Sequence, residues 1–262
     1  DELVTPRPSS DAACARAAES IVKESGIRNG YALVLDCDTG VLAYELARAA
    51  TNLSVVGIFA DEAKAQAARE GWVRTGLHVT RLLAICSKAG DPLPLPSFFA
   101  YLIVSEAAVR GGALPTDSRE IVRILKPIYG KALIGGAQGE EALKTWKAAA
   151  AADALTGAGP ADWTVSGGGD GRWAAWTRPR LKDAGGWTHD LGDAGNTMCS
   201  QDAVLKPPLG ALWYGRPYAE RHDERMSPAI QIDGVLVSHY KGTTECFDAY
   251  TGRELWRIDK LT

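Results

Sequence analysis

The sequence predicts an α/β fold in two parts: a mostly parallel sheet that ends in a hairpin, followed by an all-β segment. Short apolar runs without internal alternation are separated by helical patterns, which is typical of a parallel sheet buried on both faces. Two further strand-like runs flank the glycine-rich turn 167–171, as in a hairpin. Six of the eight Trp residues lie from Trp163 onward, so the composition changes near this point.

The first part, residues 12–181, is predicted to alternate helices and strands. Its first helix is followed by Gly26 as a stop signal, and Asp61 opens another helix as its N-cap. The predicted helices cover residues 12–24, 41–50, 61–71 and 140–155, and the predicted strands cover 31–35, 54–59, 79–85, 100–104, 131–134, 163–166 and 172–178. The Pro- and Ser-rich residues 1–11 are predicted to be a leader.

Composition argues against several functional classes. With 29 Lys and Arg against 32 Asp and Glu, the formal net charge is -3, so nucleic acid is not an expected partner. No apolar run approaches the roughly 20 residues that a membrane span needs. The five cysteines form no C-x-x-C pair. The His-acid neighbours at His189-Asp190 and His222-Asp223 are typical of polar surface clusters, and no metal site is predicted.

The segment 33–40, LVLDCDTG, is predicted to run from a strand through a tight turn into a helix, where open α/β sheets bind ligands. Together with the order of elements and the closing hairpin, it resembles the class I S-adenosylmethionine-dependent methyltransferases, whose first loop reads like G-x-G-x-G. The resemblance covers residues 12–181 and implies a Rossmann-like domain with S-adenosylmethionine as cofactor. Thr39 and Gly40 match the end of the motif, whereas Asp36 and Asp38 replace its first two glycines.

These replacements have physical consequences. Side chains at the two glycine positions crowd the approach of the backbone to the cofactor, and two carboxylates repel the cofactor's own carboxylate. The family's acidic residue after the second strand aligns with Phe59, so that Asp61 is its only substitute. Glu106 follows the fourth predicted strand, where the family keeps cofactor-facing groups. The cofactor-binding positions implied by the resemblance are Asp36, Asp38, Thr39, Gly40, Asp61 and Glu106, and no catalytic residue is assigned.

Two other interpretations of the same loop remain open. Asp36-Cys37-Asp38 after a strand resembles the D-x-D of haloacid-dehalogenase-like phosphatases, which use one Asp as nucleophile and the other as general acid beside a magnesium ion. Ser105 fits that family's later Ser or Thr, but Gly40 stands where it has Thr. Alternatively, both Asp residues serve the N-terminus of the following helix and bind nothing.

The segment 247–256, FDAYTGRELW, resembles the D-A-x-T-G-x-x-x-W repeat of PQQ-like, quinoprotein-type β-propellers. The resemblance implies a turn at Thr251-Gly252 between two blade strands and a Trp256 that packs between blades. Residues 232–238 fit the preceding strands and residues 187–213 a lead-in. Residues 182–262 supply one blade of the four or so that a ring requires. Other protein chains, or a longer polypeptide, are therefore expected to complete the propeller.

The sequence therefore predicts a methyltransferase-like pseudoenzyme, degenerate in cofactor binding, with a propeller segment for assembly. The alternatives are a weak methyltransferase that acts by positioning its substrates, a structural subunit without catalysis, and the phosphatase. An active enzyme should have an open pocket above residues 36–40, whereas a scaffold should have it filled by side chains such as Phe59 or Tyr44. The propeller resemblance favours an exported protein over a cytoplasmic one.

Overall fold

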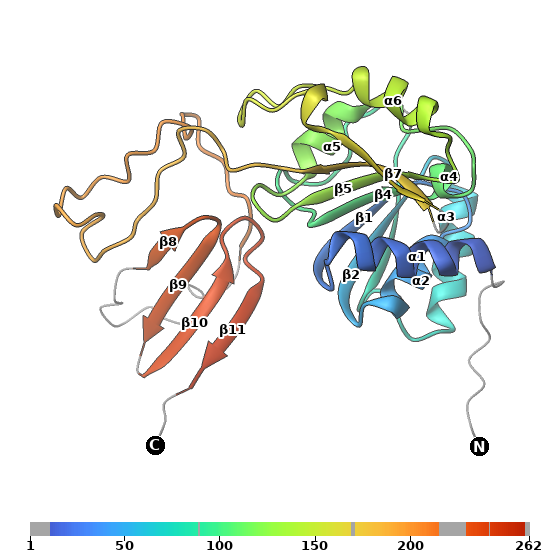
Figure 1. Ribbon diagram of the computed structural model, residues 1–262. Coiled ribbons are helices and arrows are strands. Elements are labelled where there is room, and N and C mark those ends of the chain that lie inside the picture. The colour runs from blue at the N-terminus through green and yellow to red at the C-terminus, as the bar shows by residue number, and fades with distance from the viewer. Residues whose placement is uncertain (1–10, 89, 169–170, 215–228, 241, 260–262) are drawn as a thin grey trace.

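The computed structural model describes residues 11–88, 90–168, 171–214, 229–240 and 242–259. It contains a seven-stranded sheet with the order β3-β2-β1-β4-β5-β7-β6 and a separate four-stranded sheet with the order β11-β10-β9-β8 (Figure 1). In the larger sheet, β7 pairs antiparallel with β5 and with β6, and the other neighbours are parallel. The predicted Rossmann-like sheet with its terminal hairpin is confirmed.

The helices are α1 (Ala12–Ser25), α2 (Val41–Ala49), α3 (Glu62–Val73), α4 (Glu106–Val109), α5 (Ser118–Ile124) and α6 (Glu140–Ala148), with a 3-10 turn over Pro160–Asp162. The strands of the larger sheet are β1 (Asn29–Cys37), β2 (Asn52–Phe59), β3 (Leu82–Cys86), β4 (Leu102–Ser105), β5 (Lys131–Gly136), β6 (Thr164–Gly168) and β7 (Gly171–Thr177). The smaller sheet consists of β8 (Ile230–Ile232), β9 (Val235–Tyr240), β10 (Thr243–Asp248) and β11 (Glu254–Ile258).

Both faces of the larger sheet are buried, which explains why its central strands are apolar throughout. Successive residues of β1 point to opposite sides: Val34 packs in a cluster with α1, α2 and α3, whereas Leu33 and Leu35 pack in a cluster with α5 and α6. In the first cluster, the Phe59 ring lies 6.2 Å from the Trp72 ring, centroid to centroid. The continuous apolar runs therefore reflect a layer of helices on each face.

One predicted helix, 140–155, is shorter in the structure and ends at Ala148. Tertiary contacts override the helical propensity of the alanine run that follows. Asp153 is buried and forms an ion pair with the buried Arg178, with Oδ2 and Nε 2.7 Å apart. The backbone N–H of Ala151 donates to the Ser118 hydroxyl at 2.8 Å. Pairing a buried carboxylate outweighs the small free-energy gain from a few more helical residues.

The prediction of an all-β segment over 182–262 is correct only for its last part. Among the described residues of this segment, the first regular strand begins at Ile230. Residues 182–214 form isolated β-bridges instead, such as the one between Trp187 and Gln231. Residues 1–10 of the predicted leader and the His222-Asp223 pair lie outside the described residues, and Asp11 is the N-cap of α1.

The smaller sheet is a meander in which each strand pairs antiparallel with the next. The predicted turn at Thr251-Gly252 does join β10 to β11. Asp233 and Gly234, which both have positive φ, form the tight turn between β8 and β9. The described chain contains this single four-stranded sheet and no propeller, so the propeller stays a prediction.

The smaller sheet contacts the larger sheet at the amino ends of the parallel strands of the larger sheet. Asp248, at the end of β10, accepts hydrogen bonds from Lys126 Nζ at 2.5 Å and from the Tyr101 hydroxyl. Arg253 donates to the carbonyl of Asn52, the first residue of β2, at 3.0 Å. Since the loop after β1 lies at the opposite, carboxyl edge, the C-terminal sheet leaves that edge free. No helix within the described ranges has the length and apolar character to span a membrane.

Candidate functional site

Residues 36–40, which comprise the end of β1 and the turn into α2 and are called the loop below, have an unusual backbone. Asp36 has a φ of 53° and Gly40 a φ of 71°. Gly40 also needs to be glycine for steric reasons, because a Cβ there would lie 2.7 Å from Cζ2 of Trp72. Asp is one of the few residues with a side chain that tolerates the left-handed region. The loop thus has a left-handed residue at Asp36, the first glycine position of the motif, and carries a carboxylate there.

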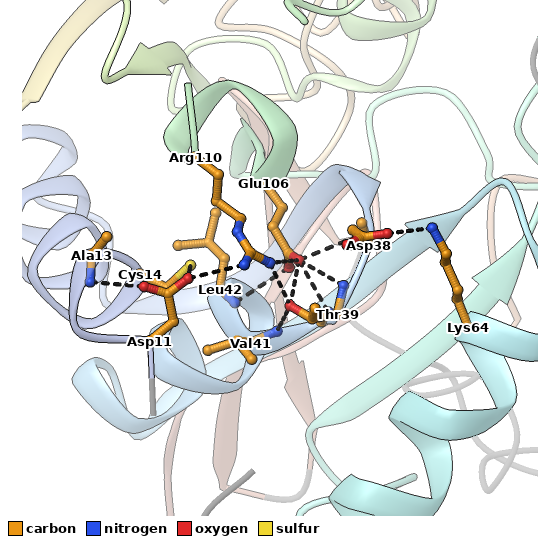
Figure 2. Close-up of polar contacts among 12 residues, drawn as sticks. Asp11, Ala13, Cys14, Asp38, Thr39, Val41, Leu42, Lys64, Glu106 and Arg110 are labelled. Carbon is orange, nitrogen blue, oxygen red and sulfur yellow. Dashed lines mark hydrogen bonds and ion pairs between the residues drawn. The ribbon is translucent and has the colours of Figure 1, made fainter. Parts of the chain in front are cut away.

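A single carboxylate, that of Glu106, holds this loop (Figure 2). Its Oε1 accepts hydrogen bonds from the backbone N–H groups of Thr39 at 2.9 Å, Gly40 at 3.2 Å and Asp38 at 3.3 Å. The Thr39 hydroxyl donates to the same oxygen at 2.8 Å, and the N–H of Leu42 donates to Oε2 at 3.3 Å. Glu106 therefore fills the ring of donors at the start of α2.

Helix α2 explains why a carboxylate is bound there. Its N-cap is Gly40, which has no side chain to accept a hydrogen bond, and its first turn contains no acidic residue. The free N–H groups and the helix dipole together make an anion site. Glu106, the first residue of α4, has no solvent exposure. Its burial as a carboxylate is offset by these hydrogen bonds.

Arg110 completes the cluster one helical turn after Glu106. Its Nη1 donates to the Thr39 hydroxyl at 3.1 Å and lies 3.9 Å from Glu106 Oε1, and its Nη2 lies 3.4 Å from a carboxylate oxygen of Asp11 (Figure 2). The loop, α4 and the start of α1 are thereby joined through one guanidinium group. A cation beside Glu106 further stabilises its buried charge.

The two Asp residues of the loop face different partners. Asp36 Oδ2 accepts a hydrogen bond from the Ser105 hydroxyl at 2.8 Å, and desolvation raises the pKa of Asp36. Asp38 is exposed and forms an ion pair with Lys64, and the hydrogen bond from Lys64 lowers the pKa of Asp38. The described residues contain no cluster of three or more metal-ligating side chains. The arrangement gives the phosphatase hypothesis no support.

A small cavity of about 130 Å³ opens beside Asp36, at the carboxyl ends of the strands. Its walls come from the ends of β1 and β2, the loop after β3 and the segment that leads into α5, with Ala60, Ser87 and Thr116 among them. Neither Phe59 nor Tyr44 fills it, because both are buried in the cluster with α1, α2 and α3 on one face of the sheet. The filling by these two side chains that is expected of a scaffold is therefore not found in the structure.

The structure separates the six predicted cofactor-binding residues into three groups. Asp36 lines the cavity. Asp38, Thr39 and Gly40 contribute backbone donors that Glu106 occupies. Asp61 does not line the cavity and instead accepts a hydrogen bond from the backbone N–H of Lys64 at 2.9 Å, as the N-cap of α3. Sequence reasoning missed the cavity-lining residues Ser87, Lys88, Thr116 and Asp117. Of these, only Asp117 carries a local signal, because it caps α5.

Comparison of the fold with solved structures gives many matches. One is a putative S-adenosyl-L-methionine-dependent methyltransferase from Methanococcus maripaludis, with 19% identity over 65% of this chain and 87% of that chain and a TM-score of 0.50. The N-terminal domain has the class I methyltransferase fold. The methyltransferase-fold domain also matches an S-adenosylmethionine-dependent methyltransferase from Aquifex aeolicus, at 21% identity over 47% of this chain and 66% of that chain, with a TM-score of 0.39. No protein-family model and no curated protein matches the chain.

Proposed function

We propose that this chain is a methyltransferase-fold protein in which binding of the methyl donor is degenerate, and that its C-terminal sheet serves assembly with other chains. The observation that carries the first half is the Glu106 carboxylate bound to the backbone N–H groups of Asp38, Thr39, Gly40 and Leu42. A ligand carboxylate that approached this loop would find its donors already taken.

The residues at the cleft fit one end of S-adenosylmethionine and not the other. The cavity beside β2 and β3 has apolar walls, including Leu35 and Ile58, and hydroxyl groups, including Ser87, a lining chemistry that suits a nucleoside. Its volume of about 130 Å³ accommodates only part of one, so that the rest of the ligand would lie in the open cleft. At the loop, the amino-acid end of the ligand would place its carboxylate near the carboxylates of Asp36 and Glu106. Like charges at short range in a partly desolvated cleft repel strongly. We therefore derive no methyl-transfer step for this chain.

Calorimetric titration with S-adenosylmethionine and S-adenosylhomocysteine tests this proposal. We expect dissociation constants weaker than about 0.1 mM for both ligands, which is more than tenfold weaker than low-micromolar binding. The physical reason is the filled donor ring and the repulsion by Asp36. A low-micromolar constant for either ligand would contradict the degeneracy.

The assembly half of the proposal rests on the smaller sheet. In β11, all five residues are exposed, and its apolar side chains Leu255, Trp256 and Ile258 are 41%, 43% and 57% exposed. β8 and β11 are the edge strands of this sheet. β8 is bridged at Gln231 by Trp187, so that β11 is the edge without a further bridge among the described residues. Unpaired edges beside exposed apolar side chains are typical of strands that pair with or pack against another chain.

Sedimentation velocity tests assembly. We expect the wild type to sediment as a species heavier than the 27.9 kDa monomer, and Trp256→Ser to shift it toward the monomer, because the indole supplies apolar contact area. Leu205→Ser is the matched control, since Leu205 is 71% exposed but lies outside the sheet. A wild type that stays monomeric at about 100 μM, well above the dissociation constants of specific complexes, would contradict self-assembly.

A further inference from the structure

We infer that the cleft selects adenosyl ligands whose side chain carries a positive charge and no carboxylate, such as decarboxylated S-adenosylmethionine. The inference deepens the proposed function and rests on its assumption that the cavity takes a nucleoside. In this cleft the protein's own carboxylate, that of Glu106, occupies the N–H donors that the carboxylate of a ligand would otherwise bind.

The main-chain N–H donors at the start of α2 are already occupied. Main-chain N–H groups at the start of a helix bind carboxylates and phosphates, and in α2 they bind Glu106 instead (Figure 2). Because Glu106 is fully buried and Arg110 lies beside it, displacing it would leave a charged group without its partners. The cleft therefore offers no free main-chain site at α2 to the carboxylate of a bound amino acid.

The carboxylate of Asp36 has an oxygen that can accept a hydrogen bond from a ligand in the cavity. Its side chain is exposed to solvent and lines the cavity. Only Oδ2 is hydrogen-bonded among the described residues, to the Ser105 hydroxyl, which leaves Oδ1 to accept from a ligand. A carboxylate in a concave, partly desolvated position attracts cations more strongly than one on an open surface. A ligand ammonium or sulfonium would meet this oxygen.

The charged side chains that line the cavity are mostly negative. The described lining contains four carboxylates, those of Asp36, Asp91, Asp117 and Glu120, against one ammonium, that of Lys88. Asp117 and Glu120 are paired with arginines, at 3.0 and 2.7 Å. Asp36 is held by a neutral hydroxyl, and Asp91 forms no ion pair among the described residues, so the charges of these two carboxylates are the ones most available to a cation. The combination of a filled anion site and an open carboxylate favours a cationic ligand without a carboxylate.

Titrating four probes into the full-length chain tests the inference: S-adenosylmethionine, S-adenosylhomocysteine, 5′-methylthioadenosine and decarboxylated S-adenosylmethionine. We expect decarboxylated S-adenosylmethionine to bind at least about tenfold more tightly than S-adenosylmethionine, which differs from it by one carboxylate. We expect the neutral 5′-methylthioadenosine to lie between them. S-adenosylmethionine and its decarboxylated form differ by one carboxylate, and S-adenosylmethionine and S-adenosylhomocysteine differ by the methyl group that makes the sulfur a sulfonium. The fourth probe, 5′-methylthioadenosine, keeps the nucleoside and lacks all three charged groups.

The variant Asp36→Asn should reduce the affinity ratio of decarboxylated S-adenosylmethionine to 5′-methylthioadenosine at least about tenfold. Asn tolerates the same positive φ, so the loop should keep its shape. Glu62→Gln is the control: Glu62 is an exposed carboxylate at the start of α3, is paired with Arg69, and does not line the cavity. It should leave the ratio unchanged.

The outcomes distinguish failure of the inference from failure of the proposed function. If no probe binds, the inference is overturned while the degenerate methyl-donor site stands. If S-adenosylmethionine binds at low micromolar concentration and as tightly as its decarboxylated form, both are overturned. If the carboxylate-free probes bind best but Asp36→Asn leaves the ratio intact, the role assigned to Asp36 is wrong.

Discussion

Replacing Lys126 with Met should destabilise the protein by about 3 to 5 kcal/mol, the cost of breaking a buried ion pair from one side. Lys126 is 1% exposed, and its Nζ lies 2.5 Å from Oδ2 of the fully buried Asp248 and 2.9 Å from the Tyr101 hydroxyl. Burial lowers the pKa of Lys126, and Asp248 opposes that shift. Without the ammonium group, the Asp248 carboxylate stays buried between the two sheets with no cation. Urea unfolding of wild type and variant measures this cost.

A second ion pair across the same junction provides the control. Arg180 Nε lies 3.2 Å from Asp233 Oδ1, with side chains 53% and 47% exposed. Arg180→Met should cost at most about 1 kcal/mol, as for other exposed pairs. In the double variant Lys126→Met, Asp248→Asn, the loss should be smaller than the sum of the single losses, because neither change then leaves an unpaired charge. Equal, small losses for Lys126→Met and Arg180→Met would show that the buried pair does not hold the junction.

Much of the larger sheet could be predicted from the sequence because its signals are local. The apolar run of β1 and the turn at Gly40 are visible within ten residues of each other. The glycines between β6 and β7 likewise mark the hairpin. Each of these features depends on periodicity or turn chemistry, which a short window contains.

The structure also shows what local patterns miss. Glu106 is 64 to 68 residues from the loop that it holds, and nothing in its own segment predicts that contact. In the structure Glu106 contacts the loop itself, and its role toward a cofactor stays a prediction. Lys126 precedes the predicted strand 131–134, and its own segment predicts no partner for it. Its partner Asp248, 122 residues away, belongs to the propeller-like motif. The motif predicted a turn, and Asp248 Oδ1 does accept from the N–H groups of Tyr250 and Thr251.

Removing the Glu106 carboxylate should have the other large effect, because several donors lose one acceptor at once. Glu106→Gln should destabilise the protein by about 3 kcal/mol, since hydrogen bonds to a charged group contribute about 1.5 to 3 kcal/mol each. The Gln amide would keep one neutral acceptor oxygen for the donors at Oε1 and would present its N–H group to the N–H group of Leu42. For a chain of this size, the loss corresponds to roughly 6 to 12 °C in Tm. Differential scanning calorimetry measures it.

Glu45→Gln is the matched control, because Glu45 is a buried carboxylate of α2 whose single partner among the described residues is Arg48, at 2.8 Å. Arg48 is 43% exposed and can return to solvent, so the variant should lose at most about 1 kcal/mol. In Glu106→Ala, the donors of α2 are left open to an external anion. Added formate should therefore raise the Tm of this variant and leave the wild type unchanged, since a ligand that binds only the folded state stabilises it. If formate has no effect on Glu106→Ala, the donor ring is not the anion site that the wild type fills with its own carboxylate.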